Sequence, residues 1–506
     1  MPEILAPAGN RESFLAALAA GADAVYCGLK HFSARMAAEN FTLHELAVLI
    51  RLAHDQGRKV YVPVNTLIKS DELNAAGRML DQLNRMAAPD ALIVQDLAMV
   101  SLARQTGFSG EIHLSTLANV SFPAALETIR QFPEIRQVVL PRELSIDEIK
   151  PLPQPARMGF LEVFVHGALC YAVSGRCYWS SYMGGKSGLR GRCVQPCRRV
   201  YEQAGQREKF FSCQDFSVDV LTKIITSVPQ IGALKIEGRK KGAHYVYYTV
   251  AAYRLLRDQA DDPNAKKTAL AYLDYAMGRR TTHYNILPQR PQNPIDISIR
   301  TGSGLLAGSV KGEGASPYVV PREAFLTGDM LRIGNEEDFW HQTFRVGKFV
   351  PKHGKLFLKF PAGRRPKNGA PVYIIDRREP ELDRMIREFE NEMTGYQKMP
   401  PETSRFQVTP PAVTAQKMAL QEMRVFRSMQ GAKKNPRDLT GVWLSSDTPR
   451  VMMGDRKRTW LWLPPVIWPD DQGKYRRWWM TPLNEDVGIL CWVRPGRWLF
   501  SGIFKN

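Results

Sequence analysis

Five of the seven cysteines in this 506-residue chain lie close together, at Cys170, Cys177, Cys193, Cys197 and Cys213, whereas Cys27 and Cys491 lie far away. Clustered thiols in a reducing compartment indicate a metal site or catalysis rather than disulfides. The first four are separated by 6, 15 and 3 residues. Four thiolates on one loop can hold zinc or an iron–sulfur cluster. Because only the last two have zinc-like spacing, the spacing leaves both centres open, with buried unliganded thiols as a third alternative.

The surroundings of these cysteines are basic. No Asp or Glu occurs from Val163 to Tyr201, and the cations there are Arg176, Lys186, Arg190, Arg192, Arg198 and Arg199. A cluster held by four thiolates is anionic, so nearby cations would stabilise it. The same cations can bind RNA phosphates, which makes Arg176, Arg190 and Arg192 candidate substrate-binding residues. The alternative is a basic loop that is solvated on one side.

The whole chain is also basic. It has 69 Lys and Arg against 50 Asp and Glu, a formal net charge of +19. Such an excess favours a polyanionic partner, chiefly RNA or DNA, although a basic, well-solvated enzyme is the alternative. The composition, 44% apolar and 24% charged, is typical of a globular protein. No apolar stretch is long enough to span a membrane and Met1-Pro2-Glu3 opens no export signal, so we expect a cytoplasmic protein with no membrane partner.

Short β-branched runs alternate with helical patterns over residues 1–260. The runs are Glu3–Ala6, Ala24–Cys27, Lys59–Val64, Ala91–Val94, Ile112–Leu114, Gln137–Leu140, Leu161–Val165 and Ala233–Ile236. Leu73, Ala76, Leu80 and Leu83 have the spacing of one buried helical stripe. Eight strands alternating with helices predict an α/β fold, a (β/α)8 TIM-like barrel with a Cys-rich insertion, 166–200, before the last strand. The alternative, a doubly wound open sheet, lacks its Gly-rich fingerprint.

In such a barrel, polar residues that follow the strands line the active-site mouth. Asn65 follows the third strand and is a candidate catalytic residue, and Arg142 follows the sixth. His166 follows the seventh strand and Glu237 and Arg239 the eighth. We expect His166 and Glu237 to transfer protons, and Arg142 and Arg239 to pair with a small anionic co-substrate. For each residue alone, the alternative is a loop hydrogen bond or a helix cap.

The remainder of the chain is expected to form four further parts. We predict a linker over 261–294, because of Asp262-Pro263-Asn264 and the later prolines, and a charged helix within 377–400. Short strands with Gly turns predict a small β-barrel over 295–376, at Ile295–Ile299, Tyr318–Val320, Met330–Ile333, Lys355–Phe360 and Pro371–Ile375. Residues 401–506 hold eight of the ten tryptophans, 17 Lys and Arg, and nine Asp and Glu. This composition suits single-stranded nucleic acid, with a Trp-rich core or an incomplete domain as alternatives.

Around the first two cysteines the chain reads Glu162-x-Phe164-x-x-Gly167-Ala168-Leu169-Cys170-x₄-Gly175-x-Cys177-x-x-Ser180. This pattern resembles the signature of the collagenase-like peptidase family U32. One departure is Trp179, where the family prefers an aliphatic residue. Further stretches similar to that family are Glu3-Ile-Leu-Ala-Pro-Ala-Gly9, Gly21-Ala-Asp-Ala-Val-Tyr26 with Gly28, and Leu234-Lys-Ile-Glu-Gly-Arg239. The resemblance covers residues 1–260 and extends at most to 376.

The resemblance implies more than the spacing does. Bacterial members include tRNA uridine and ribosomal-RNA cytidine hydroxylases, which install a 5-hydroxyl group and are linked to prephenate. Members carry a 4Fe–4S cluster on the motif cysteines, which here are Cys170, Cys177, Cys193 and Cys197. The resemblance therefore implies an RNA-modifying hydroxylase that acts on tRNA or rRNA, with prephenate as co-substrate. The alternatives are a collagenase-like peptidase and a quinone-pathway hydroxylase, and the oligomeric state stays open.

Overall fold

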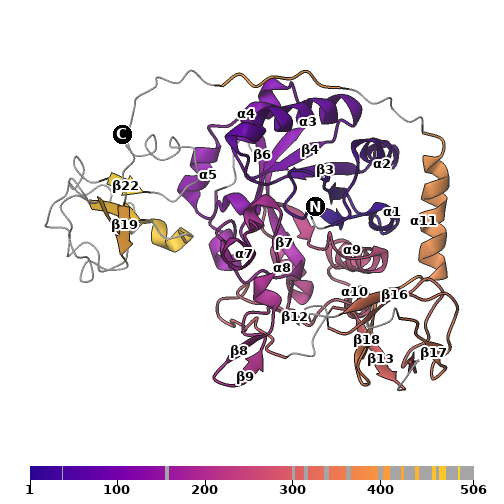
Figure 1. Cartoon of the computed structure of the whole chain (residues 1–506). Coiled ribbons are helices and arrows are strands. Elements are labelled where there is room, and N and C mark those ends of the chain that lie inside the picture. The colour runs from indigo at the N-terminus through magenta and orange to yellow at the C-terminus, as the bar shows by residue number, and fades with distance from the viewer. Residues whose placement is uncertain are drawn as a thin grey trace.

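A computed structural model describes most of the chain, with each part of the fold shown in Figure 1. The described residues are 1–36, 38–153, 159–298, 303–312, 317–335, 341–360, 366–396 and 403–410, with shorter pieces at 423–426, 439–443, 459–462, 467–473 and 488–490. Among these residues, no helix combines the length and apolar character needed to cross a membrane.

Eight parallel strands close into a barrel, as predicted. Each strand pairs with the next along the chain, and the last, β11, pairs with both β1 and β7, which closes the ring. The strands are β1 (Glu3–Ala8), β2 (Ala24–Cys27), β3 (Lys59–Val64), β4 (Ala91–Val94), β5 (Glu111–Leu114), β6 (Ile135–Val139), β7 (Phe160–Ala168) and β11 (Ile231–Ile236). All eight predicted runs coincide with these strands to within a few residues, so the TIM-like fold is confirmed.

Helices connect the strands around the outside of the barrel (Figure 1). Side-chain caps define where several begin: Asn10 accepts the Ser13 amide of α1, and Thr42 and Glu45 form a capping box at α2. The predicted stripe lies on α3, where Ala76 and Leu80 are fully buried. The helices are α1 (Arg11–Ala19), α2 (Leu43–Asp55), α3 (Leu73–Met86), α4 (Ala98–Gln105), α5 (Pro123–Ile129), α6 (Ile146–Ile149), α8 (Thr222–Thr226) and α9 (Ala243–Asp258).

A long insertion separates β7 from β11 and carries the cysteines. It contains the short helix α7 (Trp179–Gly184), a hairpin of β8 (Tyr201–Gln203) and β9 (Gln206–Glu208), and β10 (Asp215–Ser217). Strand β10 runs antiparallel to β7. On its other side β10 pairs in parallel with β12 (Thr281–Thr282). Because β10 extends the sheet from β7, the insertion folds back over the carboxyl ends of the strands.

The segment 261–294, which we predicted to be a linker, contains helix α10 (Pro263–Tyr275) packed on α9. This part of the prediction is wrong. Asp262-Pro263-Asn264 is a helix start: the Asp262 side chain accepts the Asn264 amide at 2.8 Å, and Pro263 occupies the first turn. Proline and aspartate favour both turns and helix N-termini, which is why the sequence pattern was ambiguous.

A curled antiparallel sheet follows, with an apolar core of its own. Its order is β16-β15-β18-β13-β14-β17. The strands are β13 (Leu305–Lys311), β14 (Tyr318–Val319), β15 (Met330–Ile333), β16 (Gln342–Arg345), β17 (Leu356–Phe357) and β18 (Pro371–Asp376). Over residues 295–298, the described part of the predicted strand Ile295–Ile299, Ile295 makes only an isolated bridge to Cys213, so this part of the prediction is wrong. Strand β13 was missed because a bulge beside Gly308 breaks its alternation.

Helix α11 (Pro380–Met393) lies within the predicted helical segment and packs against α1 and α2. Residues 403–410 then run along α3 and α4, where the Val408 amide donates to Asn74 at 2.8 Å. Four short parallel strands follow in the tail: β19 (Met423–Phe426), β20 (Leu439–Trp443), β21 (Thr459–Trp462) and β22 (Gly488–Leu490). Apart from these pieces and residues 467–473, the segment 401–506 lies outside the described residues, as does most of the predicted Trp-rich basic tail.

Candidate active site at the barrel mouth

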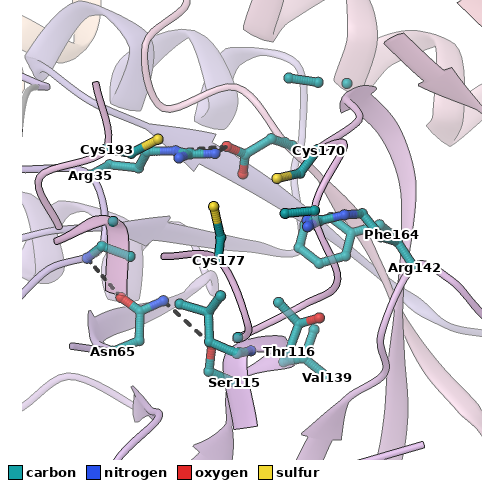
Figure 2. A pocket seen from close by; sticks show the side chains of 18 of the residues that line it. Arg35, Asn65, Ser115, Thr116, Val139, Arg142, Phe164, Cys170, Cys177 and Cys193 are labelled. Carbon is teal, nitrogen blue, oxygen red and sulfur yellow. Dashed lines mark hydrogen bonds and ion pairs between the residues drawn. The ribbon is translucent and has the colours of Figure 1, made fainter. Parts of the chain in front are cut away.

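A cavity of about 150 Å³ opens at the carboxyl ends of the barrel strands. The insertion and the strand ends line it together, and all four motif cysteines are part of its wall: Cys170, Cys177, Cys193 and Cys197. Figure 2 shows Cys170, Cys177 and Cys193 around one space, with Arg35 on one side and Arg142 on the other. The fifth clustered cysteine, Cys213, is buried and does not line the cavity. The tertiary structure thus separates four thiols from the fifth.

Two glycines let the cysteine loop lie directly on the barrel. A Cβ at Gly175 would meet the Leu117 carbonyl oxygen at 2.0 Å, and one at Gly191 would meet the Ser33 oxygen at 2.1 Å. Both have positive φ, +70° and +77°, which disfavours other residues. The loop therefore contacts the β5–α5 and β2–α2 connections closely enough to bring its thiols over the barrel.

Two loop arginines hold the loop in place instead of facing the cavity. Arg190, predicted to bind substrate, forms an ion pair with Glu72 and donates to the Leu67 carbonyl at 2.9 Å. Arg198 is buried and donates to the Leu169 carbonyl at 2.8 Å and to the Cys213 carbonyl. The loop cations accordingly divide into structural and exposed groups, which the sequence could not distinguish.

The thiols influence one another. Burial, together with the neighbouring Cys170 and Cys193, raises the pKa of Cys197 to about 12. Burial, together with Cys170 and Cys193, also raises the pKa of Cys177. Thiolates this close repel each other, so all four can ionise together only when a cationic centre binds between them.

The donor set suits a thiolate-bound centre. Four thiols surround one cavity, and the positive charge of Arg35 acts on Cys170 and Cys193. Over the described residues, no three Cys, His, Asp or Glu side chains already stand in metal-binding geometry. Binding would therefore require the cysteine side chains to rotate inward, which the partly exposed positions of Cys170, Cys177, Cys193 and Cys197 permit.

An ion pair lies beside the thiols. Arg35 donates through Nη2 to the Glu237 carboxylate at 3.0 Å, and the Tyr26 hydroxyl donates to the same carboxylate at 3.0 Å. Burial alone would raise the pKa of Glu237, but the guanidinium groups of Arg35 and Arg239 hold it below its usual value. Glu237 is therefore ionised near neutral pH, so it has no proton to donate and its role is to orient Arg35.

The other predicted strand-end residues also face the cavity. Arg239 is buried and donates to Ser33 Oγ at 2.7 Å. The Asn65 side-chain oxygen accepts the Ala34 amide at 3.0 Å, so Asn65 orients the segment that carries Arg35. Arg142 lines the cavity, and its buried Nε has no hydrogen-bond partner among the described residues. Of these side chains, Arg142 is the cation with the most capacity left for a ligand.

His166 begins a chain of hydrogen bonds that leads away from the cavity. Ser217 Oγ donates to Asp219 at 3.0 Å and therefore accepts from His166 Nδ1 at 3.2 Å. Asp219 also contacts His283 Nε2 at 3.0 Å. This order assigns the proton of His166 to Nδ1 and leaves Nε2 as the basic nitrogen. Burial lowers the pKa of His166 to about 4, so the ring is neutral near pH 7.

Sequence reasoning did not propose Tyr26, Arg35 or Lys235, which all line the cavity. Lys235 is buried inside β11 and pairs with Glu162 of β7 at 2.5 Å. A lysine in the middle of an apolar strand was a usable signal. Arg35 gave no such sequence signal, because it lies in the long connection between β2 and α2 and only the tertiary structure brings it to the cavity. Of the predicted loop cations, Arg176 also lines no part of the cavity, and Arg192 is exposed.

A parallel barrel with a four-cysteine loop across its mouth defines a narrow class of protein. The family model for peptidase family U32 matches residues 9–295. That range holds seven of the eight barrel strands, from β2 to β11, and the cysteine loop. The chain therefore belongs to peptidase family U32.

Similar proteins carry names of two kinds, for proteases and for RNA hydroxylation. An uncharacterised protease of Methanocaldococcus jannaschii is 37% identical over 52% of this chain and 66% of its own. The tRNA hydroxylation protein P of Helicobacter pylori is 30% identical over 68% of this chain and 89% of its own. The 23S rRNA 5-hydroxycytidine C2501 synthase of Escherichia coli is 36% identical over 51% of this chain and 39% of its own. This chain thus spans less than two thirds of the archaeal and Escherichia relatives.

Proposed function

We propose that this protein hydroxylates a pyrimidine base in tRNA or rRNA. One observation carries the proposal: four cysteines of a single basic loop line a cavity at the mouth of a parallel barrel. The similarity of this chain to relatives named for tRNA hydroxylation and for 5-hydroxycytidine synthesis supports it. A net charge of +19 supports a nucleic-acid substrate.

In this proposal Cys170, Cys177, Cys193 and Cys197 hold a 4Fe–4S cluster, with zinc as the alternative. A thiolate-bound cluster would supply electron transfer beside the reacting base. The cation Arg35 and the acid-free loop would offset its negative charge. Zinc would only stabilise the loop or act as a Lewis acid. The identity of the bound metal therefore distinguishes a redox role of the cysteines from a structural or Lewis-acid role.

A small anionic co-substrate such as prephenate would bind beside the thiols. Arg142 lines the cavity with a buried Nε that has no hydrogen-bond partner within the part of the chain that the structure describes, and a guanidinium binds a carboxylate through two parallel hydrogen bonds. Arg239, fixed by Ser33, adds positive charge from the neighbouring side of the barrel. Together they would bind a dicarboxylate better than a neutral molecule.

His166 is the candidate proton acceptor. Its Nε2 has no partner among the described residues, and the Nδ1 proton is held by Ser217. A neutral imidazole in that tautomer can accept a proton at Nε2 while Asp219 stabilises the charge that forms. Glu237 and Asn65 act in this scheme by orienting Arg35 and its loop.

A peptidase reaction is less well supported by the same side chains. A cysteine nucleophile needs an imidazole within hydrogen-bond distance, and over the described residues Cys170 has no such bond to His166. If Cys170 binds iron, its thiolate is also not free to attack a peptide. Gelatin cleavage by cluster-free protein would favour the peptidase instead.

The test combines a deletion strain with cysteine variants. Mass spectrometry of tRNA and rRNA should show that one 5-hydroxypyrimidine disappears on deletion and returns with the wild-type gene. Cys170→Ser and Cys193→Ser should not restore it, and their purified forms should lose iron and sulfide. Cys213→Ala is the matched control, because Cys213 is buried outside the cavity, and it should restore the base. Unchanged hydroxypyrimidine in the deletion strain would falsify the proposal.

A further inference from the structure

The cysteine loop exposes an unusual number of large apolar side chains beside the cavity. Tyr171 is 48% exposed, Tyr178 43%, Tyr182 89% and Met183 41%. We call these four residues the aromatic rim. Of the four, Tyr171 lines the cavity, and the other three lie on or next to helix α7, whose first residue, Trp179, also lines it. Exposed aromatic side chains gathered at one place mark an interaction surface.

Aromatic neighbours hold the rim residue Tyr171 in a fixed orientation. Tyr171 packs edge-on against Phe211, with ring centroids 5.3 Å apart, and tilted against Trp179 at 6.4 Å. Trp179 in turn stacks on Tyr201 at 6.0 Å and 21°. A ring supported by such neighbours loses little conformational entropy when a ligand stacks on it. Tyr171 is therefore preorganised at the cavity edge.

The charge around the rim selects the kind of partner. Lys186 and Arg192 are exposed and have no ion-pair partner among the described residues. No acidic residue occurs in the loop from Val163 to Tyr201. Exposed aromatic rings beside unpaired cations are the combination that binds single-stranded nucleic acid, because bases stack on the rings and phosphates meet the cations. In a duplex the bases are already stacked on each other, so they are not available to stack on these aromatic rings.

We propose that the aromatic rim binds single-stranded RNA on either side of the base that enters the cavity. Tyr171 and Tyr182 stack on bases, and Lys186 and Arg192 contact phosphates. This inference rests on the proposed function and adds to it: the target pyrimidine lies in an unpaired loop or end, since RNA recognition by stacking requires unstacked bases. It also explains why the rim lies at the same edge as the cysteines.

The test is fluorescence anisotropy with the full-length, anaerobically purified protein and a labelled oligouridylate of about 12 nucleotides. Tyr171→Ala and Tyr182→Ala should each weaken binding about fivefold to hundredfold, which is the usual value of one base–aromatic stack. Tyr171→Phe should bind as the wild type does. Lys186→Gln should weaken binding and lower its salt dependence. Because Tyr182 is 89% exposed, its replacement leaves the fold intact.

Phe349→Ala is the matched control, since Phe349 is 57% exposed but lies in the antiparallel sheet region. It should bind oligouridylate normally. A duplex of the same length that binds as tightly as the single strand overturns the proposal, as do rim variants with unchanged affinity. Rim-dependent binding of gelatin, with RNA binding unaffected, overturns it in favour of a protein partner. If deletion removes the modified base while rim variants still bind RNA normally, the proposed function stands and only the rim assignment fails.

Discussion

Arg35 and Glu237 form an ion pair of 3.0 Å across the barrel mouth, although 201 residues separate them in the chain. The pair joins the β2–α2 connection to the end of β11. Tyr26 binds the same carboxylate from inside the barrel. The charge that acts on Cys170 and Cys193 is thus positioned by a carboxylate that the sequence suggested as a proton-transfer group.

If the pair works as a unit, Arg35→Ala and Glu237→Gln should each lower hydroxylation about tenfold to hundredfold, the usual cost of mispositioning a group in an active site. The double variant should be no worse than the worse single variant. Modified-base levels in complemented deletion strains provide the measurement. Losses that multiply in the double variant would mean that the two side chains act independently.

Acid should destabilise the barrel through His166. Burial lowers the pKa of His166 to about 4 in the folded protein, whereas an unfolded histidine titrates near about 6.5. Between these values the unfolded chain binds the extra proton, so stability falls as the pH drops from about 6.5 to about 4, by about 3 kcal/mol at most. His166→Gln should flatten this part of the pH profile of urea unfolding. A profile identical to that of the wild type would assign the acid sensitivity to other groups.

Removing the hydrogen bond behind His166 should affect turnover rather than RNA binding. Ser217→Ala removes the shorter of the two hydrogen bonds of Nδ1, leaving the Tyr253 hydroxyl at 3.4 Å, and Asp219→Asn removes the negative charge that would stabilise an imidazolium. We expect turnover to fall by about a hundredfold or more, the scale of assisted proton transfer. Oligouridylate affinity should be unchanged. His283 contacts Asp219 at the end of this series of hydrogen bonds that is farthest from His166, so His283→Gln should leave turnover nearly unchanged. A loss of turnover as large as that of Asp219→Asn would show that the proton moves from His166 through Asp219 to His283.

Replacing Gly77 in α3 by alanine should lower the stability of the protein, although alanine usually stabilises a helix. Alanine in a helix is usually about 1 kcal/mol better than glycine, but a Cβ at Gly77 would lie 2.1 Å from the Phe406 ring. Gly77→Ala should therefore destabilise the protein and make residues 403–410 more susceptible to proteolysis. In a Phe406→Ala background the same change should stabilise it. Thermal unfolding of the four proteins completes the cycle, and the same sign in both backgrounds would contradict the packing.

The barrel could be predicted from the sequence because each of its parts is local. A buried parallel strand is a short apolar run, and a surface helix is a periodic stripe, so each is visible in its own residues. The cysteine motif was visible for the same reason, since its residues follow one another along one loop. Helix α10 was not predicted, because Asp262 and Pro263 are equally common at the start of a helix and in a turn between elements.

What only the tertiary structure decided is which side chains meet. Arg190 and Arg192 are two residues apart and chemically identical, yet one is paired with Glu72 and the other is exposed. Cys213 shares its segment with the four motif cysteines but lies outside the cavity. Such partners come from distant strands and loops, and distance along the chain carries no record of distance in space. The sequence therefore determined the barrel and the thiols, and the closure of the barrel determined which charges surround them.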